Sequence, residues 1–187
     1  MEADNRTTEL LREKPVGYEF KDEVQTGSGI FPCQTSPAIL VAQMEHLTAA
    51  KRLADRHKCE LGFINRAILQ KAIESHSLLV APCPNIDNSV NAELELVGLV
   101  HFYVRRDNVV TLCNIVVAQV YQRTGLGRRL FEELVRLTCS MGKTQIRLKC
   151  PAELPANLFY ERLGLKIVAV ELGKHRPLNV WVYTVNV

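Results

Sequence analysis

A glycine turn between an apolar stretch and an amphipathic stretch restricts the fold of this chain more than any other feature. Residues 109–117 (VVTLCNIVV) predict a buried strand, and residues 126–141 carry apolar side chains at helical spacing. Gly125 and Gly127 lie between the two, in the segment QRTGLG at 122–127. Unpaired backbone N–H groups and the positive end of the helix dipole meet in such a turn. The sequence therefore predicts an α/β domain with an anion site at the turn.

Other apolar segments predict the strands and helices around this unit. The polar turn RRDN separates two apolar runs, so strands 94–104 and 109–117 should form an antiparallel hairpin. The helix after the glycine turn leads into a strand at 144–150, which should lie parallel to strand 109–117. Asn65 is the expected N-cap of a second helix. The remaining predicted strands are 38–43, 77–81, 166–172 and 179–185, and the remaining predicted helices are 45–58, 65–75 and 155–163.

Length and composition limit the class of protein. A chain of 187 residues with 47% hydrophobic residues can form one domain with a substantial core, which we place at residues 37–187. Residues 1–36 are polar and should form a flexible leader. A net charge of +3 does not support a nucleic-acid partner. The six cysteines are too dispersed for a local metal site, and no signal sequence or membrane-length apolar run occurs, so we expect a cytoplasmic protein without a metal.

Two common nucleotide-binding motifs do not fit the glycine turn. A Rossmann site requires a third glycine where this chain has Leu130, and an acidic residue after the next strand, where Lys149 stands. A P-loop requires lysine followed by serine or threonine directly after its last glycine, but Arg128 and Arg129 occupy those positions. The sequence therefore excludes both motifs.

A third family matches the turn and a second segment. The segment QRTGLG (122–127) resembles the Q/R-x-x-G-x-G/A signature of the GNAT acyltransferase superfamily, and NLFYERLGL (157–165) resembles the N-x-F-Y-x-x-x-G-F block of many of its members. The order of predicted elements is also similar to this family over residues 36–187. Two positions depart from the pattern: Arg123 replaces a common glycine, and Leu165 replaces the usual phenylalanine.

The resemblance implies both a fold and a co-substrate. The fold is an α+β type: a mixed, mostly antiparallel sheet of six to seven strands, with a central parallel strand–helix–strand unit and helices on both faces. The co-substrate is acetyl-CoA, whose pantetheine arm would pair with the backbone of the strand at 115–117, and whose pyrophosphate would lie on the glycine turn. The implied cofactor-binding residues are Ile115, Val116, Val117, Gln122, Arg123, Thr124, Gly125, Leu126, Gly127, Arg128, Asn157 and Tyr160.

The implied reaction is direct transfer of the acetyl group from the thioester to an amine. Tyr160 is the candidate acid for the departing CoA thiolate, because a phenol is protonated at neutral pH. Many relatives carry a glutamate base where this chain has Asn114, which cannot accept a proton. Glu60 is one candidate substitute, and His101 and Tyr103, on one face of their strand, are others. A water chain or an already neutral amine would require no base.

Several questions stay open at the level of sequence. Asn114 also favours a catalytically silent acyl-CoA-binding regulatory module. A third alternative is an acetyltransferase that acts on a macromolecule, either a protein or an aminoacyl-tRNA. The acceptor amine, the preferred acyl chain and the oligomeric state are not determined, although a homodimer is compatible with the sequence.

Overall fold

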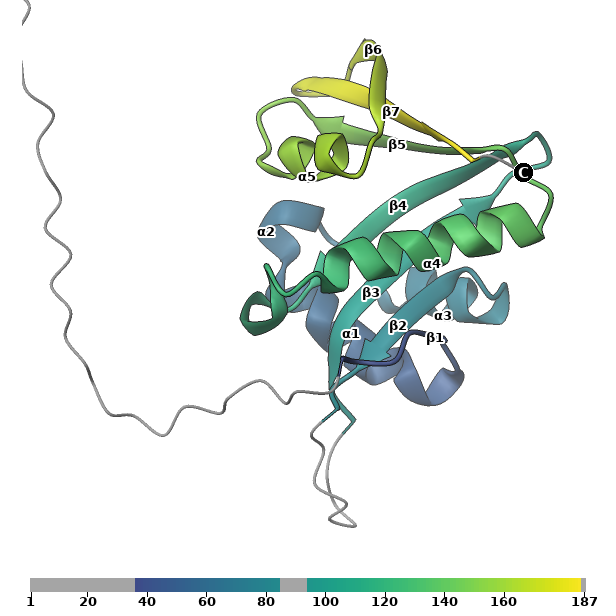
Figure 1. Cartoon of the computed structure of the whole chain (residues 1–187). Helices are drawn as coiled ribbons and strands as arrows, with labels where there is room; N and C mark the ends of the chain where they lie inside the picture. Colours follow the sequence, from purple (N-terminus) through teal and green to yellow (C-terminus); the bar gives the residue numbers. More distant parts are fainter. Residues whose placement is uncertain (1–35, 85–93, 186–187) are drawn as a thin grey trace, which may run out of the picture. The chain divides into compact units, whose positions relative to one another are not determined.

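The computed structural model of this chain describes residues 36–84 and 94–185 (Figure 1). The predicted leader, apart from Ser36, lies outside these ranges, as do residues 85–93 and 186–187. Seven strands form one sheet in the order β1-β2-β3-β4-β5-β7-β6. Their bounds are β1 (Leu40–Val41), β2 (Leu78–Pro82), β3 (Leu96–Val104), β4 (Val109–Val117), β5 (Gln145–Pro151), β6 (Lys166–Leu172) and β7 (Pro177–Thr184).

All neighbouring strands are antiparallel except β4 and β5, which are parallel. The predicted hairpin of β3 and β4 and the predicted parallel unit of β4 and β5 are both confirmed. A parallel pair requires a crossover connection, which α4 (Leu126–Ser140) supplies. The predicted fold class, a mostly antiparallel sheet with one parallel unit, is therefore confirmed.

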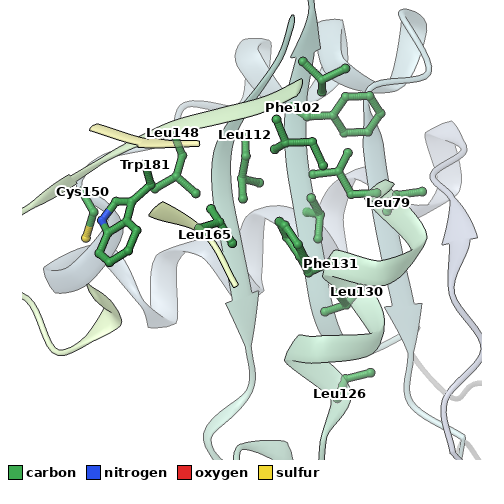
Figure 2. Packing of buried hydrophobic residues seen from close by; sticks show 14 of the residues in the cluster. Leu79, Phe102, Leu112, Leu126, Leu130, Phe131, Leu148, Cys150, Leu165 and Trp181 are labelled. Carbon is green, nitrogen blue, oxygen red and sulfur yellow. The ribbon is translucent and has the colours of Figure 1, made fainter. Parts of the chain in front are cut away.

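Helices cover both faces of the sheet, as predicted. In Figure 1, α4 crosses one face over β3 and β4, while α1 (Leu47–Arg56) and α3 (Arg66–Glu74) lie on the other face. Each face has its own apolar cluster. The first cluster runs from Leu126, Leu130 and Leu134 of α4 to Trp181 of β7 (Figure 2), and the second joins α1 and α3 to the opposite face of β2 and β3.

Short elements account for most differences from the predicted bounds. The first strand is reduced to β1, two residues long, and the 3-10 helix η1 (Met44–His46) precedes α1. The helix α2 (Lys58–Leu61) and the 3-10 helix η2 (Gln119–Tyr121) were not predicted, because single turns are too short to show a hydrophobic period. α5 (Ala156–Arg162) begins directly after Pro155.

Side-chain contacts confirm two of the predicted helix details. The Asn65 Oδ1 accepts a hydrogen bond from the Ile68 backbone N–H at 2.8 Å, which is the predicted N-cap of α3. On α4, Leu126, Leu130 and Leu134 are buried as expected. Met141 is 39% exposed, because α4 ends at Ser140 and Met141 already lies past its last turn.

Within the described ranges, no helix combines the length and the apolar character that a membrane span requires.

Candidate active site

The parallel strands β4 and β5 pair over only three positions and then separate. Their register runs from Val109 opposite Gln145 to Thr111 opposite Arg147. β5 continues to pair with β7 on its other side, while β4 continues to pair with β3. The edge of β4 from Leu112 to Val117 therefore has no strand partner on the β5 side, and we call this stretch the open edge (Figure 1).

A β-bulge lies at the start of the open edge. His101 of β3 is opposite Asn114, but the next residue, Phe102, is opposite Leu112. Cys113 is thus the extra residue of β4, with no counterpart on β3. A bulge bends its strand and increases the local twist, and so it favours the separation of β4 from β5.

The direction of the backbone groups along the open edge follows from one hydrogen bond. The Ala118 N–H donates to the Val97 carbonyl of β3 at 2.8 Å. Because backbone groups alternate in direction along a strand, Val116 also faces β3, whereas Ile115 and Val117 direct their backbone groups to the open edge. The Gln122 Nε2 already donates to the Val117 carbonyl at 3.2 Å. Of the three residues predicted to pair with pantetheine, Ile115 and Val117 are the two with suitable backbone groups.

The glycine turn adopts an unusual backbone conformation. Gly125, the N-cap of α4, has φ +89°, and Arg123 has φ +64°. Both values lie in the left-handed region that glycine favours, so a glycine would fit the position of Arg123 without strain. Within the described part of the chain, the N–H groups from Arg123 to Arg128 donate to no backbone or side-chain acceptor. Successive unpaired N–H groups at a helix start are suited to binding an anion.

Side chains from this turn brace the local structure. The Thr124 Oγ1 donates to the Tyr121 carbonyl at 2.7 Å. The Arg128 Nη2 donates to the Arg162 carbonyl of α5 at 3.2 Å, and the Arg129 guanidinium donates to Ser36 and Pro37. The two arginines hold α5 and the start of the described chain against α4.

Gly127 lies where α4 and α5 approach each other. A Cβ at this position would lie 3.3 Å from two ring carbons of Phe159 and 3.6 Å from the Val117 Cγ2. The two segments that carried the family resemblance, the glycine turn and α5, are therefore in direct contact. Gly125 differs, because an added Cβ there would meet no heavy atom within 4 Å and the positive φ alone explains the glycine.

Tyr160 is half-buried among aromatic rings beside β5 and β7. Its ring centroid lies 5.5 Å from that of Phe159 and 6.2 Å from that of Trp181. Burial, and secondarily the neighbouring Cys150 thiol, raise the pKa of the Tyr160 hydroxyl well above its ordinary value. Among the described residues, none hydrogen-bonds to this hydroxyl. Tyr160 is thus a protonated phenol with its hydrogen-bonding capacity still available.

Asn157 is saturated with hydrogen bonds to the protein. Its amide nitrogen donates to the carbonyl of the last residue of β5 and to two carbonyls of the loop between β5 and α5, and its Oδ1 accepts from two side chains of β7. The partners are Pro151 O at 2.8 Å, Ala152 O at 3.2 Å, Leu154 O at 2.8 Å, Trp181 Nε1 at 2.9 Å and Asn179 Nδ2 at 3.1 Å. Asn157 therefore fixes the loop that precedes Tyr160.

We expect Asn157→Ala to destabilise the domain by roughly 2–4 kcal/mol, because the Trp181 N–H and several half-buried carbonyls would lose their partner. Urea unfolding followed by tryptophan fluorescence measures this loss. Asn179→Ala, which removes only one hydrogen bond to the same oxygen, is the matched control and should cost about 1 kcal/mol. Equal losses in the two variants would contradict the role of Asn157 as the anchor of this loop.

Comparisons with known proteins agree with this geometry. The model of the acetyltransferase (GNAT) domain matches residues 59–175, more than half of the chain, and includes the glycine turn, the open edge and α5. The chain belongs to the GNAT acetyltransferase family. No curated protein sequence matches it.

Solved structures share the GNAT fold at low sequence identity. The ribosomal-protein-S18-alanine N-acetyltransferase of Escherichia coli is 20% identical with a TM-score of 0.61, and covers 81% of this chain and 96% of its own. Arabidopsis thaliana NAA60, in complex with a bisubstrate analogue, is 15% identical with a TM-score of 0.65 and covers 81% and 99%. An aminoglycoside 6'-N-acetyltransferase complexed with coenzyme A is 17% identical with a TM-score of 0.62 and covers 80% and 97%. These likenesses establish the fold.

The three candidate bases of this GNAT domain lie in different environments, and Asn114, which cannot accept a proton, lies beside one of them. Asn114 is half-buried on β4, next to the bulge, and its Oδ1 lies 3.4 Å from the Nδ1 of His101, a residue that is 2% exposed. The Tyr103 ring packs edge-on against the imidazole with a centroid distance of 4.8 Å. Glu60 is exposed on α2, with its Oε2 3.5 Å from the Nδ1 of His57. Among the described residues, no recorded contact joins Glu60 to Asn114 or Tyr160.

The sequence did not reveal which of these residues belong together. His101 lies opposite Asn114 because of the register in which β3 pairs with β4, and this register cannot be read from the sequence alone. The described part of this GNAT chain contains no group of three or more His, Cys, Asp or Glu residues arranged to hold a metal.

We expect His101 to make the stability of the protein depend on pH. Burial lowers the pKa of the His101 imidazole below its ordinary value of 6.5, against a smaller raising effect of the Asn114 hydrogen bond. The unfolded state then binds more protons than the native state, so stability falls as pH drops below about 6.5. Thermal unfolding of the wild type and of His101→Gln between pH 7 and pH 5 tests this. The wild type should lose more Tm than the variant over this interval, and parallel losses would contradict the expectation.

Proposed function

We propose that this protein binds acetyl-CoA and transfers its acetyl group to an amine by direct attack in a ternary complex. One observation carries the proposal: the row of unpaired N–H groups from Arg123 to Arg128 follows the open edge of β4 along the chain, separated from it only by the short helix η2 and its flanking residues. Fixed N–H groups suit the pyrophosphate, and an unpaired strand edge suits the amide-containing pantetheine arm.

The proposed contacts divide between backbone and side chains. Ile115 and Val117 contact the pantetheine through their backbone, while Val116 contributes a buried side chain behind them. The turn binds the pyrophosphate through its N–H groups, and the exposed Arg123 side chain adds positive charge. The residues of the turn in this proposal are Gln122, Arg123, Thr124, Gly125, Leu126, Gly127 and Arg128.

The cysteines near the open edge favour direct attack over a covalent acetyl-enzyme. Burial raises the pKa of the Cys113 thiol to about 11, and burial is also the main cause that raises the pKa of Cys150 to about 11. The thiolate is the nucleophilic form of cysteine, so neither residue is activated at neutral pH. The acceptor amine therefore attacks the thioester carbon itself.

Two protons must move during this reaction: the attacking amine loses one, and the departing CoA thiolate gains one. When the amine attacks, the carbonyl becomes an oxyanion, which a backbone N–H of β4 stabilises. When the tetrahedral intermediate collapses, the carbon–sulfur bond breaks and Tyr160 gives its proton to the CoA thiolate. Asn157 acts by holding the loop that positions Tyr160, since its own amide is saturated. Glu60 remains a candidate for a contact with the acceptor.

One observation supports a second function, an acyl-CoA-binding regulatory module without turnover. Asn114 stands where relatives carry a carboxylate base, and an amide cannot accept a proton. Action on a protein or an aminoacyl-tRNA is a narrower form of the first proposal. The net charge of +3 does not support an RNA partner. RNA binding that weakens steeply with salt would favour the tRNA form.

Mass spectrometry with a panel of amines separates these functions. The panel contains peptides with free N-termini, lysine peptides with blocked N-termini, spermidine and an aminoglycoside. We expect acetyl-CoA to convert to CoA with an equal amount of one acetylated amine. Binding of acetyl-CoA without turnover on this panel and on cell-extract proteins would favour the silent module.

We also propose that this protein is cytoplasmic and forms a homodimer. The described cysteines are all free, in keeping with a reducing cytoplasm.

β6 is an edge strand with exposed Ile167, Val168 and Val170, which supports a homodimer through that edge. Sedimentation equilibrium would give the mass of a single chain if this assembly does not form.

A further inference from the structure

Charged side chains gather on the exposed face of β5, next to the open edge. Arg147 and Lys149 are exposed and alternate with Ile146, Leu148 and Cys150, which are buried in the first apolar cluster. That cluster packs against α4 and α5, so Arg147 and Lys149 extend from the opposite face of the sheet. In Figure 1, α1 and α3 lie on this opposite face but farther along the sheet, over β2 and β3. Arg147 and Lys149 are thus accessible to a ligand.

The two cations bind the same carboxylate on β6. The Arg147 Nη2 lies 3.3 Å from the Glu171 Oε1, and the Lys149 Nζ lies 2.5 Å from the Glu171 Oε2. β7 lies between β5 and β6, so both ion pairs pass over β7, where Val180 is fully buried. The hydrogen bond from Lys149 is the main cause that lowers the pKa of the Glu171 carboxyl, which is therefore ionised at neutral pH. One carboxylate thus faces two cations.

Lys166 adds a third positive charge to this face. Val182 of β7 is opposite Arg147 on one side and opposite Lys166 of β6 on the other. Residues directly opposite each other share a face, so Lys166 lies on the same face as Arg147 and Lys149. Within the described ranges, no recorded ion pair joins Lys166 to a carboxylate. Against Glu171, the three cations leave an excess of two positive charges, and we call these four residues the basic surface.

The basic surface begins where β4 and β5 separate. Arg147 is opposite Thr111, the last residue of β4 that pairs with β5, and Lys149 is two residues farther along β5. Asn114 faces the same side of the sheet as Thr111, since their partners on β3 pack against each other. The basic surface is therefore next to the face of β4 that presents Asn114.

The other face of the sheet at this separation is occupied. Leu112 and Leu148 are both 3% exposed and pack in the first apolar cluster together with Trp181 (Figure 2). The glycine turn begins α4 on this same face, so the proposed acetyl-CoA reaches the open edge from there. The acceptor amine then has to reach the thioester from the remaining side, across the face that carries Asn114 and Lys149.

We propose that the acceptor is an acidic peptide segment, whose carboxylates lie within about three residues of the reacting amine and bind the basic surface. This inference rests on the proposed function and names the acceptor class of the same site. A carboxylate suits the surface, because Arg147 and Lys149 already bind one in Glu171 and positive charge remains in excess. RNA is less suited, because three cations and a net charge of +3 do not form the basic stripe that RNA-binding proteins present.

Acetyl transfer to matched peptides tests the acceptor class. Three peptides have free N-termini and differ only at their second to fourth positions, which are all glutamate, all glutamine or all arginine. A second set has blocked N-termini and a single lysine, and so distinguishes the two kinds of amine. We expect kcat/KM to be roughly three- to tenfold higher for glutamate than for glutamine at low salt, and the ratio to approach one at high salt. Turnover without a preference for glutamate would overturn the inference and leave the proposed function intact.

Charge changes on the basic surface test whether it causes the preference. Lys149→Glu should abolish or reverse the preference for glutamate. Glu171→Gln releases both cations and should raise kcat/KM for the glutamate peptide by roughly two- to fivefold, whereas a purely structural role of Glu171 gives no gain. Lys71→Glu is the matched control, because it makes the same change of net charge at an exposed position of α3 and should keep the wild-type ratio. Equal losses of preference in both lysine variants, or no gain in Glu171→Gln, would contradict the inference.

A binding measurement requires no turnover. The glutamate peptide with an acetylated N-terminus resembles the product, and calorimetry with CoA-saturated protein measures its affinity. We expect it to bind at least roughly threefold more tightly than the glutamine form, and Lys149→Glu to remove the difference. Equal affinities of the two peptides for the wild type would overturn the inference even if no panel amine is acetylated. Displacement of the glutamate peptide by tRNA, with a steep dependence on salt, would assign the surface to RNA and overturn it as well.

Discussion

Tyr160→Phe is expected to lower kcat by roughly a hundredfold or more while the affinity for acetyl-CoA stays nearly constant. The change removes only a hydroxyl that no described residue hydrogen-bonds, and it keeps the ring that packs near Phe159 and Trp181. The lost interaction therefore belongs to the transition state, in which the thiolate takes its proton. Single-turnover acetyl transfer measures this effect.

Tyr183→Phe is the matched control for this prediction. Tyr183 is a half-buried tyrosine of the same apolar cluster, on β7, and its ring packs edge-on against Phe131 at 5.3 Å. It should keep nearly full activity. A Tyr160→Phe protein that is as fast as wild type would remove Tyr160 from the mechanism.

Gly125→Val should weaken acetyl-CoA binding by roughly a hundredfold, because a branched side chain at φ +89° strains the turn that presents the N–H groups. Calorimetric titration measures the affinity, and circular dichroism checks the fold. The site at Gly125 has room for a side chain in the structure without ligand, so misfolding is not expected.

Gly142→Val separates backbone strain from ligand binding. Gly142 has φ +66°, also has open space around its Cα, and lies beyond the opposite end of α4. It should lose a similar amount of stability and keep its affinity for acetyl-CoA. Similar losses of affinity in both variants would assign the effect of Gly125 to general destabilisation.

The fold could be predicted well because its main signals are local. The bounds of β4 and β6 were predicted as observed, since continuous apolar runs define them and polar turns end them. α4 was predicted from the spacing of Leu126, Leu130 and Leu134. Single-turn elements such as α2 were missed, because they contain no period.

The candidate site could be predicted only in part, because some of its properties arise from pairing between distant strands. The Cys113 bulge and the contact of Asn114 with His101 depend on the register of β3 and β4, which a single sequence does not reveal. Two of the five hydrogen bonds of Asn157 come from β7 and depend on the placement of that strand. The glycine turn and α5 were recognised separately, but their contact through Gly127 and Phe159 is a property of the fold.

Calorimetric titration of the wild-type protein with acetyl-CoA tests the central claim most directly. We expect one molecule of acetyl-CoA to bind per chain and to raise the Tm, with ATP and NADH less effective because neither fills both the glycine turn and the open edge. Absence of binding heat with both acetyl-CoA and CoA, together with an unchanged Tm, would contradict it.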